Sequence, residues 1–234
     1  MATILNIDTS LKVCSVALSS EGCILYHLED FNGPNHAYLL SNFIKSSLDY
    51  LKEYDDMKLD AVSVSVGPGS YTGLRIGLSE AKGIAYGLKL PLIGINTLEL
   101  LAVEAMFEIP DFDPENDLLI PVIDARRNEV YTSAYDSRLL NVMGQQALIL
   151  DNESYGSLPK NKRFIFVGDG AKKVSEIVLS LNDDSIFLKD TLPLATGMTP
   201  LSEKYFYDKK FLDLAYSTPN YIKEFQATVP KSKI

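Results

Sequence analysis

The order in which strand-like and helix-like patterns follow one another strongly limits the architecture of this chain. Three short apolar runs of strand length come first, and helical and strand-like stretches then alternate up to about residue 108. In chain order, we predict strands at Ile4–Asp8, Val13–Leu18 and Cys23–Leu28, a helix at His36–Tyr54, a strand at Leu59–Val66, a helix at Tyr71–Lys89, a strand at Leu92–Asn96 and a helix capped by Thr97. This order predicts a mixed β-sheet flanked by helices, which is the α/β class.

The second half of the chain repeats this order in a shortened form. Both halves begin with an apolar strand that ends in an aspartate, Asp8 or Asp124, and both turn directly into a second strand-like run. The later predicted elements are strands at Leu118–Asp124, Glu129–Tyr135, Ala147–Leu150 and Phe164–Gly168, and helices at Ala171–Leu181 and Leu194–Lys210. Because a polar, proline-containing stretch at 109–117 separates the halves, we predict two lobes, residues 1–108 and 109–234.

Composition narrows the classes of protein to consider. Hydrophobic residues make up 46% and charged residues 23% of the chain, which is typical of a globular protein. The net charge of −9 argues against a protein that grips a nucleic acid alone, since such proteins usually carry a basic face. The apolar runs are too short to span a membrane and the N-terminus does not resemble a signal peptide, so we expect a cytoplasmic protein.

The two cysteines are expected to be free thiols. A turn separates the strands that carry them, and we predict that Cys14 faces His27 across this hairpin. The thiols would then lie about 13 Å apart along the strand, which is too far for a disulfide.

A glycine-rich segment, Gly67–Arg75, links a buried strand to a helix and is the clearest candidate for a functional loop. It lacks the lysine of a Walker loop, and its glycines miss the dinucleotide spacing by one residue. It is either a tight strand-to-helix turn or an anion site at a helix N-terminus. The loops that begin at Asp8 and Asp124 are equally ambiguous, because Asp, Thr and Ser can bind a phosphate or only form an ordinary turn.

Histidine is scarce, and this argues against catalysis by the chain alone. Only His27 and His36 are present. A zinc or iron site of the His-x-x-x-His type would need a second imidazole one turn after His36, where Leu40 stands. Since there is also no serine in a nucleophile-elbow context, we predict neither a metal site nor a catalytic residue.

Several segments together resemble the TsaB family, also called YeaZ. The resemblance covers nearly the whole chain and rests on residues 6–10, 36–40, 67–75, 124–131, 167–171 and 219–222. It implies an actin-like, sugar-kinase and Hsp70 type of fold with two ribonuclease H-like lobes. It also implies a non-catalytic partner that is required to form N6-threonylcarbamoyladenosine in tRNA. An older label of the family, M22 glycopeptidase-like, has no support in this sequence.

The resemblance further implies which molecules this chain meets. The catalytic member is a paralogue, TsaD, with which the chain would form a heterodimer, and TsaE would supply an ATPase activity. The chain would reach tRNA only through the complex and would form a homodimer when alone. We expect no tightly bound cofactor, with ATP or ADP only at the interface of the complex.

In the family, the first two helices pack against those of TsaD as a four-helix bundle, which implies a set of contact residues here. The implied partner-binding residues are His36, Leu39, Leu40, Phe43, Ser70, Tyr71, Gly73, Leu74, Gly77, Leu78 and Ala81. The candidate nucleotide or phosphate loops contain Asp8, Thr9, Ser10, Asp124, Arg126, Gly168 and Gly170. Two other hypotheses remain open: an actin-fold phosphotransferase that uses Asp8 and Asp124, and a metallohydrolase.

Overall fold

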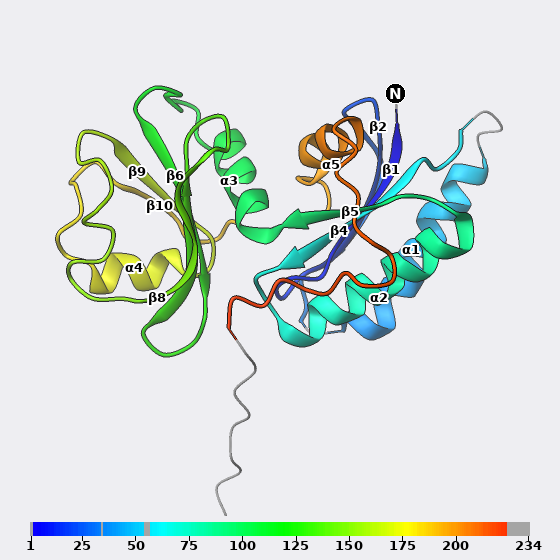
Figure 1. The fold of residues 1–234 in the computed structure, drawn as a ribbon, viewed down its shortest axis with the longest axis horizontal. Helices are drawn as coiled ribbons and strands as arrows, with labels where there is room; N and C mark the ends of the chain where they lie inside the picture. The colour runs from blue at the N-terminus through cyan, green and yellow to red at the C-terminus, as the bar shows by residue number, and fades with distance from the viewer. Residues whose placement is uncertain (1, 34, 54–56, 224–234) are drawn as a thin grey trace, which may run out of the picture.

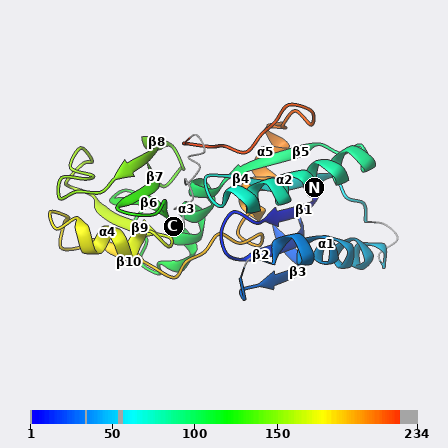
Figure 2. The same cartoon turned by 90° about the horizontal axis from the view of Figure 1, so that it is seen from below.

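The first lobe is built on a mixed five-stranded sheet. The computed structural model describes residues 2–33, 35–53 and 57–223. The strands are β1 (Thr3–Asp8), β2 (Cys14–Ser20), β3 (Cys23–Asp30), β4 (Ala61–Gly67) and β5 (Leu92–Asn96), in the order β3-β2-β1-β4-β5. β1 pairs with β2 in the antiparallel sense and with β4 in the parallel sense. Helices α1 (His36–Lys52) and α2 (Tyr71–Leu88) lie side by side on one face of this sheet (Figures 1 and 2).

The second lobe repeats the first. Its strands are β6 (Asp117–Asp124), β7 (Glu129–Tyr135), β8 (Asn141–Ile149), β9 (Arg163–Val167) and β10 (Ile186–Leu188), and its helix is α4 (Ala171–Ile177). The order β10-β9-β6-β7-β8 matches that of the first sheet when β6 is aligned with β1. The parallel and antiparallel pairings match as well. The predicted α/β class with two lobes of mixed sheets is therefore confirmed.

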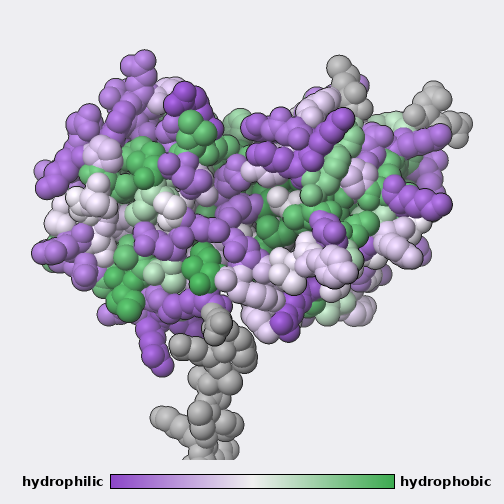
Figure 3. All heavy atoms as spheres, viewed as in Figure 1, coloured by the Kyte–Doolittle hydropathy of each residue, from purple (hydrophilic) through white to green (hydrophobic). Residues whose placement is uncertain are grey.

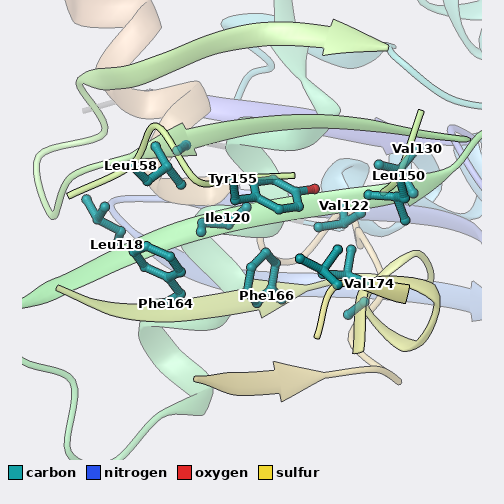
Figure 4. Close-up of a cluster of buried hydrophobic side chains, with 13 residues drawn as sticks. Leu118, Ile120, Val122, Val130, Leu150, Tyr155, Leu158, Phe164, Phe166 and Val174 are labelled. Atoms are coloured by element: carbon teal, nitrogen blue, oxygen red, sulfur yellow. The ribbon is translucent and has the colours of Figure 1, made fainter. Parts of the chain in front are cut away.

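The second lobe has its own hydrophobic core. Figure 4 shows Phe164 and Phe166 of β9 next to Ile120 and Val122 of β6, and all four side chains are buried. The ring of Tyr155 packs edge-on against Phe166, with 5.1 Å between the ring centroids. Such edge-to-face pairs stabilise a core beyond the area that they bury.

Helix α3 (Thr97–Glu108) lies between the two sheets (Figure 1). Leu98 and Leu101 pack in one cluster with residues of β6 and β9, whereas Leu100 and Val103 pack in another with residues of β1 and β5. A helix that is buried on two sides needs apolar residues around most of its circumference. This explains why the sequence of α3 shows no clear polar face.

The end of the chain returns to the first lobe. Helix α5 (Thr199–Tyr207) packs on β1 and β5, and Leu212 N donates to Leu92 O at 2.8 Å. Ala195, Met198 and Leu201 fill the face of the first sheet opposite α1 and α2. The boundary between residues 108 and 109 stays a prediction. Residues 195–223, which we had assigned to the second lobe, pack mainly on the first, with further contacts to the second at Asn220 and Lys223.

Some predicted bounds were wrong. The first residue of α3 is Thr97, and its N-cap is Asn96, whose side chain accepts from Leu98 N at 2.8 Å. The helices expected at 171–181 and 194–210 span only 171–177 and 199–207, and the strand expected at 147–150 spans 141–149. β10 was not predicted, and the expected helix end at Tyr54 lies outside the described residues.

The predicted register of the first hairpin was wrong as well. Cys23 lies opposite Ser20, because only Glu21 and Gly22 form the turn. Cys14 lies opposite Asp30, because a β-bulge between Leu18 and Ser19 shifts the register by one further residue. Both cysteines are nevertheless free, as predicted, with Cys14 buried and Cys23 exposed.

The surface is mixed in character. Figure 3 shows a mostly hydrophilic face with patches of hydrophobic residues on both lobes. Of the described helices, none is long and apolar enough to cross a membrane.

Candidate functional site

The loop after β1 is sealed by the start of α2. Asp8, Thr9 and Ser10 have no exposed surface. Ser70 N donates to Ser10 O at 2.6 Å, and the Thr9 hydroxyl donates to Gly73 O at 2.8 Å. Ser10 Oγ in turn donates to an Asp8 carboxylate oxygen at 2.9 Å. The polar groups of this loop are therefore bonded inside the chain.

Three glycines allow this close approach. A Cβ at Gly69 would lie 2.2 Å from Ser10 O, and one at Gly73 would lie 2.1 Å from Thr9 O. A Cβ at Gly77 would lie 2.3 Å from Thr9 Oγ1. The glycine segment is thus a strand-to-helix turn that packs directly against the loop after β1. Asp8, Thr9 and Ser10 are buried beneath this turn, whereas Lys12, farther along the same loop, is exposed. The role of the three buried residues as a nucleotide or phosphate loop stays a prediction.

The corresponding loop of the second lobe is open. Asp124 forms an ion pair with Lys173 at 2.6 Å, and the same carboxylate accepts from Arg126 N at 2.6 Å. Asp169 accepts from Asp124 N at 2.8 Å, which joins this loop to the start of α4. Burial raises the pKa of Asp169, and this hydrogen bond acts in the opposite direction. Asp124 and Arg126 thus lie together at one exposed edge.

The glycines near this edge serve packing. A Cβ at Gly168 would lie 2.6 Å from Val122 O, and one at Gly170 would lie 2.7 Å from a Val122 methyl group. They allow the start of α4 to lie against β6. Among the described residues, no hydrogen bond joins this edge to the sealed loop that contains Asp8, so the two predicted phosphate loops do not share a hydrogen-bond network.

Acidic side chains gather near the contact between the lobes. Burial raises the pKa of Glu104 on α3 to about 7, and the charges of Glu108, Asp8 and Glu29 raise it further. Burial also raises the pKa of Asp8 to about 6, against the hydrogen bonds from Ser10. One carboxylate oxygen of Glu104 is buried without a hydrogen-bond partner among the described residues.

Removing the charge of Glu104 is expected to stabilise the protein at alkaline pH. The folded state holds the Glu104 proton up to about pH 7, whereas the unfolded chain releases it near pH 4.5. Stability from this group is therefore present below pH 4.5 and is lost as the pH rises through 7. Glu104→Gln should raise the free energy of unfolding by about 1–3 kcal/mol at pH 8 and change it little at pH 4.

Urea denaturation at both pH values measures this difference. The surface variant Glu153→Gln is the control, and it should match the wild type at both values. An equal effect of Glu104→Gln at pH 4 and pH 8 would contradict the assignment.

His36 is held as a structural residue. Its side chain is 5% exposed, and Nε2 lies 2.9 Å from Leu11 O. Leu40, one turn later, is fully buried in the core of the first lobe. Among the described residues, no three His, Cys, Asp or Glu side chains are placed to hold a metal ion together.

Most residues of the implied partner surface lie inside the chain. Seven of the eleven are buried: His36, Leu40, Gly73, Leu74, Gly77, Leu78 and Ala81. Leu39 and Phe43 are half-buried against the same core, and Tyr71 is half-buried too. Ser70 is exposed and caps α2 by accepting from Gly73 N. The apolar stripes of α1 and α2 thus cover their own sheet, and a partner-binding role for these residues stays a prediction.

The outer face of these helices carries a different surface, which we call the α1–α2 groove. It is shallow and open, with a volume of about 630 Å³. Its lining residues are Ala37, Arg75, Ile76, Ser79, Glu80, Gly83 and Ile84. Sequence analysis placed Arg75 at the end of the glycine-rich segment but named none of these residues as partner-binding. The sequence pattern that could have indicated this surface is the recurrence of small residues every four positions, at Ser79, Gly83 and Gly87.

Space is open above this row of small residues. Gly83 and Gly87 are exposed, and a Cβ on either would meet no described atom within 4 Å. These two glycines therefore differ from Gly73 and Gly77, which are needed inside the chain.

Comparisons with known proteins agree with this architecture. Residues 33–231 match the family model described as "TsaD: tRNA N6-adenosine threonylcarbamoyltransferase". A Bacillus subtilis protein named "tRNA threonylcarbamoyladenosine biosynthesis protein TsaB" is 27% identical over 96% of this chain and 96% of its own length. A protein of the same name from Buchnera aphidicola subsp. Schizaphis graminum is 31% identical over 73% of this chain and 80% of its own length.

A solved structure also matches both lobes of this chain. YeaZ from Pseudomonas aeruginosa is 25% identical, and its structure aligns with 94% of this chain and 100% of its own with a TM-score of 0.77. Sequence and structure thus agree over nearly the full length of both lobes. The chain belongs to the TsaB family, also called YeaZ.

Proposed function

We propose that this chain is a non-catalytic partner that is required to form N6-threonylcarbamoyladenosine in tRNA, and that it acts by pairing with the catalytic paralogue TsaD. Membership in the TsaB family supports the role in this modification, because the relatives are named for it. The observation that carries the pairing is the α1–α2 groove, which is open and has the small residues Ala37, Ser79 and Gly83 in its lining.

The groove suits a helix from a second protein. Small residues such as Ser79 and Gly83 let the axes of two helices come close, so that a partner's side chains can fill the space above them. The chain matches a family model described as TsaD, so the paralogue is expected to present an equivalent pair of helices. The same surface would pair with a second copy of this chain when the paralogue is absent.

The internal structure supports a role without catalysis. The loop at Asp8 is sealed by α2, and His36 is bonded to the backbone. We therefore propose that ATP or ADP, if the reaction needs it near this chain, binds at the joint with the paralogue. The net charge of −9 supports contact with tRNA through other subunits, among them TsaD and the ATPase TsaE, in a cytoplasmic complex.

Reconstitution of the modification tests this proposal. Purified TsaD, TsaE, tRNA and a source of the activated threonylcarbamoyl group are combined with and without this chain, and modified adenosine is measured by mass spectrometry. We expect product to depend on the chain by at least about tenfold, because an obligate partner contributes more than about 1.4 kcal/mol to the active assembly. Equal product without the chain would overturn the proposed role.

A further inference from the structure

The end of the described chain forms a strap along α2. We define the C-terminal strap as residues 213–223, which include the Pro219–Ile222 segment that the sequence analysis singled out. Figure 1 shows it in red, passing α2 toward the region between the lobes. Lys82 of α2 donates to Ser217 O at 2.6 Å, and Asn220 N donates to Val66 O at 2.7 Å. The strap is therefore held to the lobe that carries the α1–α2 groove.

The strap brings an aromatic ring to Arg75, which lines the groove. Arg75 Nε donates to the Tyr221 hydroxyl at 2.8 Å. The guanidinium carbon lies 3.9 Å from the ring centroid of Tyr71 and 5.8 Å from that of Tyr221. The two rings lie 5.1 Å apart. Arg75 is thus held by stacking and by a directed hydrogen bond, although it is exposed.

Arg75 keeps donors available for another molecule. Among the described residues, its two terminal nitrogens have no hydrogen-bond partner. The other charged residue of the groove, Glu80, already accepts from the Ser41 hydroxyl at 2.7 Å. A planar guanidinium with two parallel free N–H groups is suited to a carboxylate. The groove is therefore complementary to a surface that has small or apolar residues and one carboxylate.

The strap is also fixed at the other lobe. The Asn220 amide donates to Gln145 Oε1 at 3.0 Å, and the Asn96 amide donates to the same oxygen at 2.8 Å. Lys223 forms an ion pair with Glu129 of β7. Contacts to both lobes thus fix the position of Tyr221. They hold its ring next to Arg75.

We infer that the C-terminal strap is part of the partner-binding surface, in which Tyr221 orients Arg75 to bind a carboxylate on the catalytic paralogue. Tyr221 is a positioning residue, and Arg75 makes the contact. An arginine that is held in its bound geometry loses less conformational freedom on binding, so its contact contributes more to affinity. Arginine and tyrosine are also the residue types that most often dominate interfaces. This inference rests on the proposed function, since it names the paralogue as the occupant of the groove.

Binding measurements with the full chain test the inference. The dissociation constant for purified TsaD is measured by calorimetry at low and high salt for the wild type and for Arg75→Ala, Tyr221→Ala and Tyr221→Phe. We expect Arg75→Ala to bind about 50-fold more weakly and to lose part of the salt dependence, because a charge pair is removed. Tyr221→Ala should bind about tenfold more weakly, and Tyr221→Phe, which keeps the stacked ring, about threefold.

Two controls separate orientation from general damage. Tyr216→Ala changes an aromatic residue on the same strap that is 85% exposed, and it should bind like the wild type. In the Arg75→Ala background, Tyr221→Ala should cause no further loss, because Tyr221 acts through Arg75. Thermal unfolding of each variant verifies that the fold is kept, and Tyr221→Phe remains informative if Tyr221→Ala unfolds.

The possible outcomes distinguish the proposed pairing with TsaD from the proposed role of the C-terminal strap in that pairing. Wild-type binding together with unchanged binding by Arg75→Ala would overturn the inference and leave the proposed function standing. A full additional loss from Tyr221→Ala in the Arg75→Ala background would also overturn it. Absence of wild-type binding to TsaD, with homodimers only, would overturn the proposed pairing and the inference with it.

Discussion

Replacing Gly73 by alanine is expected to lower the free energy of unfolding by about 3 kcal/mol or more, since a new methyl group must displace backbone atoms. The added Cβ would lie 2.1 Å from Thr9 O, a distance that real structures do not tolerate. Either α2 must move away from β1 or the loop at Asp8 must open. Both changes break the hydrogen bond from the Thr9 hydroxyl to Gly73 O. Urea denaturation followed by circular dichroism measures the loss.

Gly87→Ala is the matched control in the same helix. A Cβ there meets no described atom within 4 Å, so the substitution should be neutral or stabilising by up to about 1 kcal/mol, as expected from helix propensity. Equal effects of the two substitutions would show that the contact between α2 and the loop at Asp8 contributes little to stability.

Replacing Gly83 by glutamate is expected to weaken binding to TsaD by about 100-fold or more while the chain stays folded. Gly83 lies in the α1–α2 groove with open space above it, so a larger side chain fits the isolated chain but fills the place of a partner helix. Burying the added charge in an interface without a partner raises the cost further. Calorimetry with purified TsaD measures the affinity, and thermal unfolding verifies the fold.

Gly144→Glu is the control for this variant. Gly144 is an exposed glycine on β8 of the second lobe, and a Cβ there also meets nothing within 4 Å. It should bind TsaD like the wild type. If Gly83→Glu also binds like the wild type, the groove is not the contact surface, and the proposed pairing must use another face.

The sequence predicted the central strands well because their hydrophobic patterns are strong. The run at Ala61–Gly67 and the repeated strand–Asp–strand order marked the fold class without further information. β8 was placed too short, since it is an edge strand with many polar residues, and edge strands are buried on fewer sides. β10 has three residues, which is too short for a periodic signal.

The candidate site was harder to predict, for a physical reason. An apolar stripe on a helix marks the face that is buried, but it does not tell whether its own sheet or another chain buries it. Leu74 and Leu78 therefore seemed suited to a partner, whereas the structure buries both within the first lobe. The contact between Arg75 and Tyr221 joins residues 146 positions apart, and no local pattern reports such a pairing.

The return of the chain to the first lobe has a consequence for folding during synthesis. The five strands of the second sheet, residues 117–188, are contiguous, whereas the first lobe needs α5 and the strap to complete its packing. Because a protein leaves the ribosome from its N-terminus, the lobe that begins the chain is the last to be finished. A stalled or truncated product that ends near residue 190 would therefore carry a complete second sheet and an uncovered, aggregation-prone face on the first.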